Sequence, residues 1–445
     1  MRLSFGLHAM ILVGCAFDPS DVGSSVDPVS QLRIFDPANF SGYDASGKTE
    51  SSDAFQAAIH AASVYASAHP GAADLYHPAT LANGPNAPQA IVRATRGVFK
   101  LSSVYLESNV RLEIDAGAVI IPPNTSQSVA LQIVDLPSQG GVNGKGYVDN
   151  VTITSHGTSS TFADVGGTTR TKSVKYAIQY PDGSSMSLAN KFVVDIDPTR
   201  YAASGGAGNG PRYVAIKVRQ GRHFLIENML ALANDGNAGV APNGAVQGSN
   251  TYPATASPAI AFDAALGSAN TEAAVQPRNG TIRQVHGENC TRGYGITEIH
   301  SGVDLDFSYV SARGGMTIRW ESEGGGQSTR QTATQCVSHD GNAVYLMSNH
   351  GLPQTQLHAS YGIAYGDDDG IRTMGTPSKT TQSSMDHVEI HGGTRAQVVK
   401  YNNGTDDYWW YDESEQAIDN TLGVKLSNMT CSGSFQRGPT GGSCN

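Results

Sequence analysis

The sequence predicts an all-β chain wound as a right-handed parallel β-helix with an N-terminal capping helix, and three observations lead to this fold. Gly is abundant at 51 residues, charged residues make up only 15%, and short apolar runs alternate with stretches rich in Asn, Ser and Thr, which favours strands and turns over long helices. A single amphipathic helix precedes the strands. Strand-like segments then recur between Asn279 and Lys400 at about the spacing of one β-helix coil.

The capping helix is predicted in the segment that starts at residue 51. Ser52 can cap it, and Phe55, Ile59 and Ala62 share one face before Pro70-Gly71 ends the helix. A parallel stack of coils leaves the apolar end of its first coil open to water. We therefore expect this helix to cover that end.

Short strands are predicted at 90–92, 97–101 and 110–114. In the last of these, Val110, Leu112 and Ile114 alternate with charged residues, which is the pattern of a strand with one face in a core. Residues 120–280 are richer in Gly, Ala and Ser, and we interpret them as further coils with long loops. The prediction is one β-helix domain over residues 30–445, after a leader at 1–15.

The leader resembles a bacterial lipoprotein signal. An apolar run follows Arg2 and ends in Leu12-Val13-Gly14-Cys15, which would make Cys15 the lipidated residue. A plain secretory signal cleaved slightly later is the alternative. Both predict that the protein is secreted or anchored on the outer membrane at the cell surface.

Four further cysteines suggest disulfide bonds in an exported protein. Cys431 and Cys444 enclose a tail rich in Gly and Ser, and Cys290 and Cys336 lie about two coils apart. We predict these two pairings from their positions.

The charge balance limits the classes of partner. The formal net charge of −10 argues against nucleic acid, because phosphate binding needs a basic face. An acidic polysaccharide remains possible if Arg and Lys gather in one groove. We expect a monomer.

The candidate catalytic residues lie on a strand predicted at 316–323. Alternation directs Ile318 and Trp320 into the core, so Arg319, Glu321 and Glu323 emerge together on the outer face. Alternate residues on a strand lie about 6.6 Å apart, and carboxyls separated by roughly 6.5–9.5 Å leave room for the water of an inverting glycosidase. The same pattern is also typical of a solvated face with an ion pair.

Stacking of the coils is predicted to enlarge this group. Glu298 and His300 would lie on one side of the row, and Tyr345 and His350 on the other. A wall that gathers Glu, His, Arg and Tyr suits a site that cleaves sugars.

Arg313 and Arg372 would offer positive charge to an anionic chain. Taken singly, an arginine in such a pattern is more often a solvated surface residue. Neither interpretation can be separated from the other by spacing alone.

At these residues the sequence resembles the iota-carrageenases of glycoside hydrolase family 82, which are extracellular β-helix enzymes that hydrolyse β-1,4 linkages of a sulfated galactan with inversion. The resemblance covers the N-terminal third and the catalytic coils. Its stretches are the capping helix, SNVRLEIDAGAVI, Arg278-Asn279-Gly280, Gly293-Tyr294-Gly295-Ile296, Gly314-Gly315 through Glu323, and Ala343-Val344-Tyr345 ahead of His350.

The resemblance implies roles for individual residues. The family's arginine, glutamate acid and aspartate base fall on Arg319, Glu321 and Glu323, and its active-site histidine falls on His350. Two positions depart from the family: the base is Glu323 in place of Asp, and Glu298 stands where the family has glutamine. A third carboxylate would raise the pKa values of its neighbours or favour a bound cation.

Three functions follow as hypotheses. The first is an endo-acting hydrolase of a sulfated galactan, with Glu321 as acid and Glu323 as base. The second is a polysaccharide lyase of the same architecture acting on a uronate polymer, and the third is a glycan-binding β-helix without turnover. No cofactor is required by the first, although the acidic run Asp367-Asp368-Asp369-Gly370 could hold a structural calcium or be a solvated turn.

Overall fold

The computed structural model describes seventeen stretches of the chain. They are residues 32–78, 87–121, 127–135, 146–163, 177–195, 212–232, 260–262, 276–288, 296–322, 326–341, 343–349, 351–367, 370–374, 379–395, 398–402, 405–409 and 424–437. The predicted leader, with Cys15, lies outside them.

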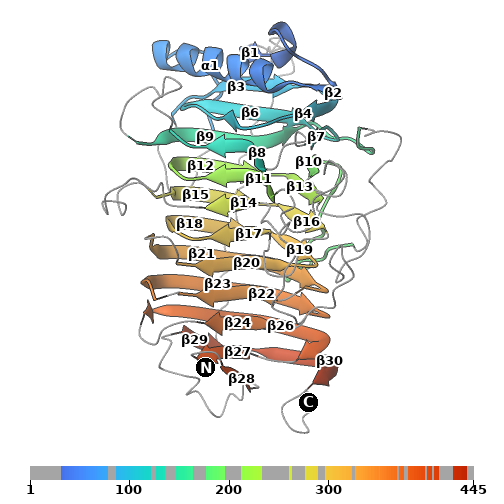
Figure 1. Ribbon diagram of the computed structural model, residues 1–445, viewed down its shortest axis with the longest axis vertical. Helices are drawn as coiled ribbons and strands as arrows, with labels where there is room; N and C mark the ends of the chain where they lie inside the picture. The colour runs from blue at the N-terminus through green and yellow to red at the C-terminus, as the bar shows by residue number, and fades with distance from the viewer. Residues whose placement is uncertain are drawn as a thin grey trace, which may run out of the picture.

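The chain winds into a right-handed parallel β-helix, as predicted (Figure 1). One sheet of ten strands, called here the narrow sheet, is parallel except for its last pair, β27 and β28, which run antiparallel. Its strands are β5 (Val104–Tyr105), β8 (Gln127–Ile133), β11 (Arg212–Val218), β14 (Ile260–Phe262), β17 (Thr297–Ile299), β20 (Met316–Glu321), β22 (Ala343–Ser348), β24 (Ile371–Met374), β27 (Val398–Asn402) and β28 (Thr405–Trp409).

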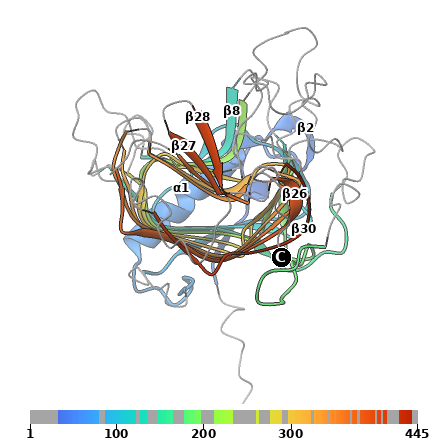
Figure 2. The same ribbon diagram turned by 90° about the horizontal axis from the view of Figure 1, so that it is seen from below.

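The second sheet, called the wide sheet, has twenty strands and bends around the other faces of the coil (Figure 2). Its strands are β1 (Ile34–Phe35), β2 (Ser46–Glu50), β3 (Ala90–Ala94), β4 (Val98–Lys100), β6 (Val110–Asp115), β7 (Val119–Ile121), β9 (Val148–His156), β10 (Phe192–Asp195), β12 (Gly221–Glu227), β13 (Met229–Leu232), β15 (Arg278–Arg283), β16 (His286–Glu288), β18 (Gly302–Ser308), β19 (Ser311–Arg313), β21 (Ser328–His339), β23 (Gln354–Tyr365), β25 (Thr380–Thr381), β26 (Ser383–Arg395), β29 (Val424–Ser427) and β30 (Thr430–Arg437).

Two helices are described, η2 (Pro37–Asn39) and α1 (Ser52–Ala68), and α1 lies over the N-terminal end of the coil (Figure 1). Phe55, Ile59 and Ala62 are fully buried against that end, as predicted. Ser52 is not the cap. The helix begins after Ser51, whose hydroxyl bonds Asp44 in place of the helix amides. No described helix combines the length and hydropathy needed to span a membrane.

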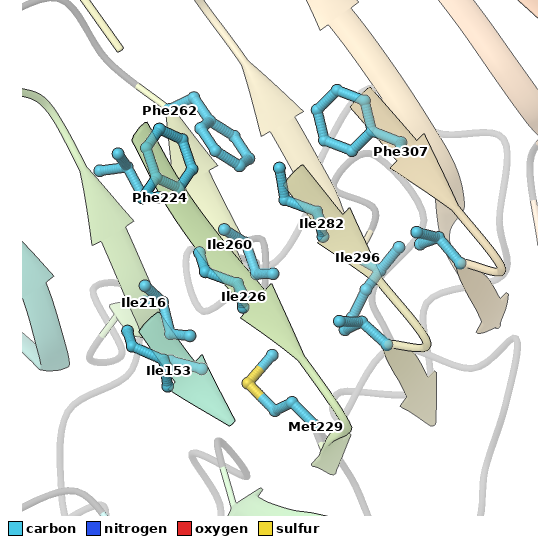
Figure 3. Close-up of a cluster of buried hydrophobic side chains, with 14 of the residues drawn as sticks. Ile153, Ile216, Phe224, Ile226, Met229, Ile260, Phe262, Ile282, Ile296 and Phe307 are labelled. Carbon is cyan, nitrogen blue, oxygen red and sulfur yellow. The ribbon is translucent and has the colours of Figure 1, made fainter. Parts of the chain in front are cut away.

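The core is a continuous column of aliphatic and aromatic side chains (Figure 3). Phe224 stacks on Phe262 with ring centroids 6.3 Å apart, and Phe262 meets Phe307 edge to face at 5.8 Å. Gly280 follows from this packing, because a Cβ there would lie 2.1 Å from the Phe224 ring. Side chains of this size each contribute about 1.5–3 kcal/mol when fully buried.

The wide sheet bends at two columns of residues with positive φ. One column contains His223, Asn279 and Asp304, and the other contains Asn228, Gln284 and Tyr309, so each of these coils has two bends five positions apart. Left-handed backbone is costly outside Gly and is best tolerated by Asn and Asp. On the wide sheet, the coils from β18 to β26 repeat every 26 residues, as Thr355 and Thr381 show, in keeping with the recurrence of strand-like segments predicted between Asn279 and Lys400.

Cys336 corrects one predicted disulfide. Its thiol is free and fully buried in β21, and burial raises its pKa to about 12, so it stays protonated and unreactive. The pairing of Cys290 with Cys336 is therefore wrong. The pairing of Cys431 with Cys444 stays a prediction, since Cys444 lies outside the described residues.

Candidate active site

Two adjacent strands of the narrow sheet, β17 and β20, carry the candidate site. Ile299 pairs with Trp320 and Glu298 with Arg319 across these strands. Ile299, Ile318 and Trp320 are fully buried in the core, so alternation directs Glu298 and Arg319 to the outer face. The predicted placement of Glu298 beside Arg319 is therefore confirmed.

Trp320 fixes the position of the outward residues on either side of it. It is fully buried, stacks on Tyr345 with centroids 6.3 Å apart, and donates from Nε1 to the Gln331 side chain at 2.8 Å. Truncating a buried aromatic of this kind costs roughly 3–5 kcal/mol. A strand anchored this firmly holds Arg319 and Glu321 in fixed orientations.

Arg319 bridges the two carboxylates of the site. Its Nη1 lies 3.0 Å from Glu298 Oε1 and its Nη2 lies 2.5 Å from Glu321 Oε1. His300 Nε2 lies 3.5 Å from Glu298 Oε1 and 3.7 Å from Glu321 Oε2. We call Glu298, His300, Arg319 and Glu321 the carboxylate cluster.

The carboxylate cluster is only partly accessible. The side chains of Glu298 and Glu321 are 8% and 4% exposed, whereas those of Arg319 and His300 reach 16% and 26%. Two carboxylates and one guanidinium leave one excess negative charge when His300 is neutral.

Glu298, His300 and Glu321 could also hold a cation, since one ligand atom from each lies within 4.8 Å of the others. Arg319 already supplies positive charge to both carboxylates. A metal would have to displace its guanidinium or share the carboxylates with it. Asp367 of the predicted calcium loop accepts a hydrogen bond from the Gly341 amide, and the two acidic residues after it are outside the described chain.

The side chains of three predicted site residues are not described by the structure. Glu323, the predicted base, and His350 lie outside the described residues. Arg372 is described through its backbone, which pairs with Leu346 in the same row as Arg319. Their predicted roles stay predictions.

Tyr345 is a correction, because it is not on the outer wall. It pairs with Ile318, is fully buried, and donates its hydroxyl to the Ser360 carbonyl at 3.0 Å. The residues that continue the outer rows are Leu346 beside Arg319 and Ser348 beside Glu321. The prediction was off by one residue in register, which moves a side chain to the opposite face.

Arg313 is a second correction, because it does not lie on the narrow sheet with the carboxylate cluster. It lies on β19 of the wide sheet, is 2% exposed, and its Nε donates to Glu288 Oε2. The other oxygen of Glu288 bonds His286 Nε2 at 2.9 Å, and His286 Nδ1 bonds Ser311 Oγ at 2.8 Å. We call His286, Glu288, Ser311 and Arg313 the buried network.

The sequence analysis did not single out Lys217 and Arg219 on the same sheet as the carboxylate cluster. Lys217 pairs with Ala261, which pairs with Glu298, so Lys217 is in the row of Glu298 and Arg319. The segment from 217 to 222 contains three cations in six residues. This local density of cationic residues was the signal by which the sequence could have pointed to Lys217 and Arg219.

No protein-family profile and no curated protein matches the chain. Solved structures do match. An iota-carrageenase complexed to iota-carrageenan fragments matches at 11% identity and TM-score 0.58, over 94% of this chain and 93% of that one. An iota-carrageenase of family GH82 from A. fortis, without chloride ions, matches at 13% and 0.56, over 93% and 92%.

A 1,3-α-1,4-β-D-galactose-4-sulfate-3,6-anhydro-D-galactose-2-sulfate 4 galactohydrolase matches at 15% identity and TM-score 0.52, over 83% of this chain and 73% of that one. At such identities the likeness establishes a shared fold. It is the carboxylate cluster that bears on the chemistry.

Proposed function

We propose that the protein is an extracellular, endo-acting glycoside hydrolase that cleaves β-1,4 linkages of a sulfated galactan with inversion, and that iota-carrageenan is its substrate. The observation that carries this proposal is Arg319 held between Glu298 and Glu321 on one outer face. The structural neighbours described as iota-carrageenases support the choice of substrate.

In this proposal Glu321 is the general acid. It protonates the glycosidic oxygen, while Arg319 fixes the carboxyl in position and His300, 3.7 Å away, holds a proton close by. Glu298 keeps a second negative charge near the sugar that develops positive character as the bond breaks. Glu323 removes a proton from the attacking water on the opposite face.

The spacing of the carboxyls also fits a second mechanism, hydrolysis with retention. Oxygens of Glu298 and Glu321 lie within 4.8 Å of each other, closer than the roughly 6.5–9.5 Å of inverting enzymes and near the 5–5.5 Å of retaining ones. In a retaining mechanism Glu298 would be the nucleophile and Glu323 would have no direct role.

The stereochemistry of the first product separates the two mechanisms. Proton NMR during early hydrolysis reports which anomer forms first. Inversion, together with loss of activity in Glu323→Gln, supports Glu323 as the base. Retention, together with loss of activity in Glu298→Gln and an active Glu323→Gln, would assign the reaction to Glu298.

The substrate is tested by incubation with iota-, kappa- and lambda-carrageenan, agarose, pectate and alginate, followed by assay of new reducing ends. We expect activity on iota-carrageenan and none on the uronate polymers. An unsaturated, ultraviolet-absorbing product from pectate or alginate would identify a lyase. Binding without any new ends would identify a glycan-binding protein.

We also propose export, with Cys15 as the lipid-bearing residue of a surface-anchored form. The support is the leader pattern alone. Mass spectrometry of the mature N-terminus tests it: diacylglycerol on Cys15 supports the anchor, and an unmodified N-terminus after residue 15 would leave a secreted form.

A further inference from the structure

We propose that Gln354 is a positioning residue for Glu321, and that it holds the backbone on both sides of the general acid from inside the coil. Gln354 is the first residue of β23 on the wide sheet and is fully buried. Because it is buried, it acts through Glu321 and not by contact with a substrate. The inference rests on the proposed function, since it assigns a further role in the same reaction.

Glu321 lies where the regular backbone of the narrow sheet ends. It is the last residue of β20, and its register partner Ser348 is the last residue of β22. Element ends open more easily than their interiors. A catalytic group has to be held within about 0.5 Å of its productive position, so the end of β20 needs support beyond the sheet itself.

The side-chain amide of Gln354 supplies this support. Its Nε2 donates to the Ser348 carbonyl at 2.8 Å and to the Trp320 carbonyl at 3.3 Å. Both partners are carbonyls, so only the NH₂ end of the amide can face them, and its two hydrogens are both used. One buried group thus joins the ends of β20 and β22.

This amide fixes both peptide groups that flank Glu321. The Trp320 carbonyl belongs to the peptide group before Glu321, and the Ser322 amide belongs to the one after it. Ser322 N donates to the same Ser348 carbonyl at 3.1 Å. Because peptide groups are planar, holding both of them restricts φ and ψ of Glu321. The direction of its Cα–Cβ bond, and so the approach of its carboxyl to Arg319, is restricted with them.

Two further buried side chains hold the amide of Gln354 in place. Thr380 is its register partner in the next coil and donates from Oγ1 to Gln354 Oε1 at 3.1 Å. Asn349 Nδ2 donates to Thr380 Oγ1 at 3.1 Å. Thr380 is 2% exposed and Asn349 is fully buried. A buried hydrogen-bonded network of this kind specifies one arrangement of its members, so Gln354 presents its donors in a fixed direction.

Gln89 has the same chemistry at a place without candidate catalytic residues. It is 2% exposed, donates from Nε2 to the Asn150 carbonyl at 3.0 Å, and accepts from Thr152 Oγ1 at 3.1 Å. Asn150 and Thr152 lie on β9 of the wide sheet. A loss of turnover that follows Gln354 but not Gln89 therefore separates positioning of Glu321 from the burial of a glutamine.

The test compares Gln354→Met with Gln89→Met, since methionine keeps the length of glutamine without its donors and acceptor. Release of reducing ends from iota-carrageenan gives kcat and KM, and urea unfolding gives the midpoint. In Gln354→Met we expect kcat to fall about 10- to 100-fold, because a misplacement of about 1 Å can cost that much, while KM stays within about twofold. Gln89→Met should keep kcat, although its urea midpoint falls to a similar extent.

The pH dependence of kcat is the second measurement. Its alkaline limb reports loss of the proton from the general acid. In Gln354→Met this limb should move to higher pH, because a carboxyl farther from the Arg319 guanidinium gives up its proton less readily. The limb should not move in Gln89→Met, where only stability changes.

Thr380→Val and Thr152→Val repeat the comparison with a milder change, since each removes one hydroxyl that donates to a buried glutamine. We expect kcat to fall about threefold in Thr380→Val and to stay unchanged in Thr152→Val, and this pair decides if Gln354→Met does not fold. Equal kcat within each pair, with superimposable pH profiles, would make Gln354 a structural residue only and leave the proposed function intact. A parent that releases no reducing ends from any of the polysaccharides would overturn the proposed function and this inference with it.

Discussion

Two neighbouring coils carry two clusters with the same chemistry on opposite sheets. The carboxylate cluster uses β17 and β20 of the narrow sheet, and the buried network uses β16 and β19 of the wide sheet. Each has an arginine that pairs with a glutamate, and a histidine two positions along the chain from a glutamate. The first is partly open to solvent, whereas the second is essentially closed.

The difference comes from what lies over each cluster. Segment 177–190 packs on the wide sheet, where Tyr180 and Ile178 contact Val337 and Ile363 and Met186 reaches Ser311. A buried ion pair whose groups are all hydrogen-bonded fixes a local arrangement. A similar set of side chains that stays accessible to solvent can contact a substrate. Strand pattern alone does not separate a structural cross-link from a site.

The largest effect is expected from Glu321→Gln. Loss of a general acid reduces turnover by roughly 10²- to 10⁴-fold, with little change in the midpoint of thermal unfolding. Reducing-end assays on iota-carrageenan measure it, with the exposed Glu389→Gln as control. Retention of more than a tenth of the activity would remove Glu321 from the chemistry and with it the contrast between the clusters.

Arg313→Met tests the buried network. Removing one partner of a buried ion pair costs about 3–5 kcal/mol, so the free energy of unfolding in urea should fall by that amount while activity per folded molecule persists. Arg283→Met is the control, because its pair with Glu227 is 45% exposed on the arginine side and should cost under about 1 kcal/mol. Equal losses would contradict the difference in burial.

His339, which is mostly buried in the wide sheet, is expected to make the free energy of unfolding depend on pH. Burial lowers the pKa of His339 to about 4 from an ordinary 6.5. Between these values the unfolded chain binds the proton and the folded chain does not, so stability present above pH 6.5 is lost as the pH falls toward 4. His339 is partly exposed, so we expect a loss of about 1–3 kcal/mol.

Urea unfolding at pH 7, 5.5 and 4.5 measures this loss. His339→Phe keeps a ring to stack on Tyr365, 4.6 Å away in the native pair, and should flatten the dependence. His60→Phe, at a side chain 55% exposed, should leave it unchanged. Parallel curves for the parent and His339→Phe would show that another group causes the acid sensitivity.

The smallest effect is expected at Tyr345, which lies in the core and stacks on Trp320 of β20. Tyr345→Phe removes one buried hydrogen bond to the Ser360 carbonyl and should cost about 1 kcal/mol of unfolding free energy. KM should not change. A raised KM with an unchanged free energy of unfolding would instead indicate that Tyr345 contacts the substrate. Tyr361→Phe, at an exposed tyrosine, is the control.

Alternation and apolar periodicity were enough to predict the β-helix, the capping helix and the outward row of Arg319 and Glu321. They also predicted Glu298 and His300 as neighbours of that row, because β17 and β20 are separated by one short coil, with partners such as Glu298 and Arg319 only 21 positions apart. Tyr345 was placed wrongly because register between coils depends on turn length, and a one-residue change reverses the face. The local sequence pattern predicts the strands but not the register between strands of neighbouring coils.

Arg313 and Cys336 were placed wrongly for a different reason. The segment that contacts Ser311, two positions before Arg313, lies more than a hundred positions earlier in the chain, so the burial of this network has no local signal. Cys336 faces the core of its own coil, where a small apolar thiol packs well without a partner. Lys217 was missed because residues 120–280 gave no readable repeat. Long-range packing decides all three.

In the wide sheet, the spacing between the two bends of a coil is constant, whereas the length of the coil varies. From His223 to His387 the bends stay five positions apart in six coils, while wide-sheet partners in successive coils are as few as 25 positions apart between Arg278 and Val303 and as many as 56 between Arg222 and Arg278. Insertions have therefore been accepted outside the bent segment, near the narrow sheet. Loops bordering the groove can be lengthened, shortened or exchanged by evolution or in the laboratory while the stacked bends keep every coil in register, so specificity and foldability can be altered independently.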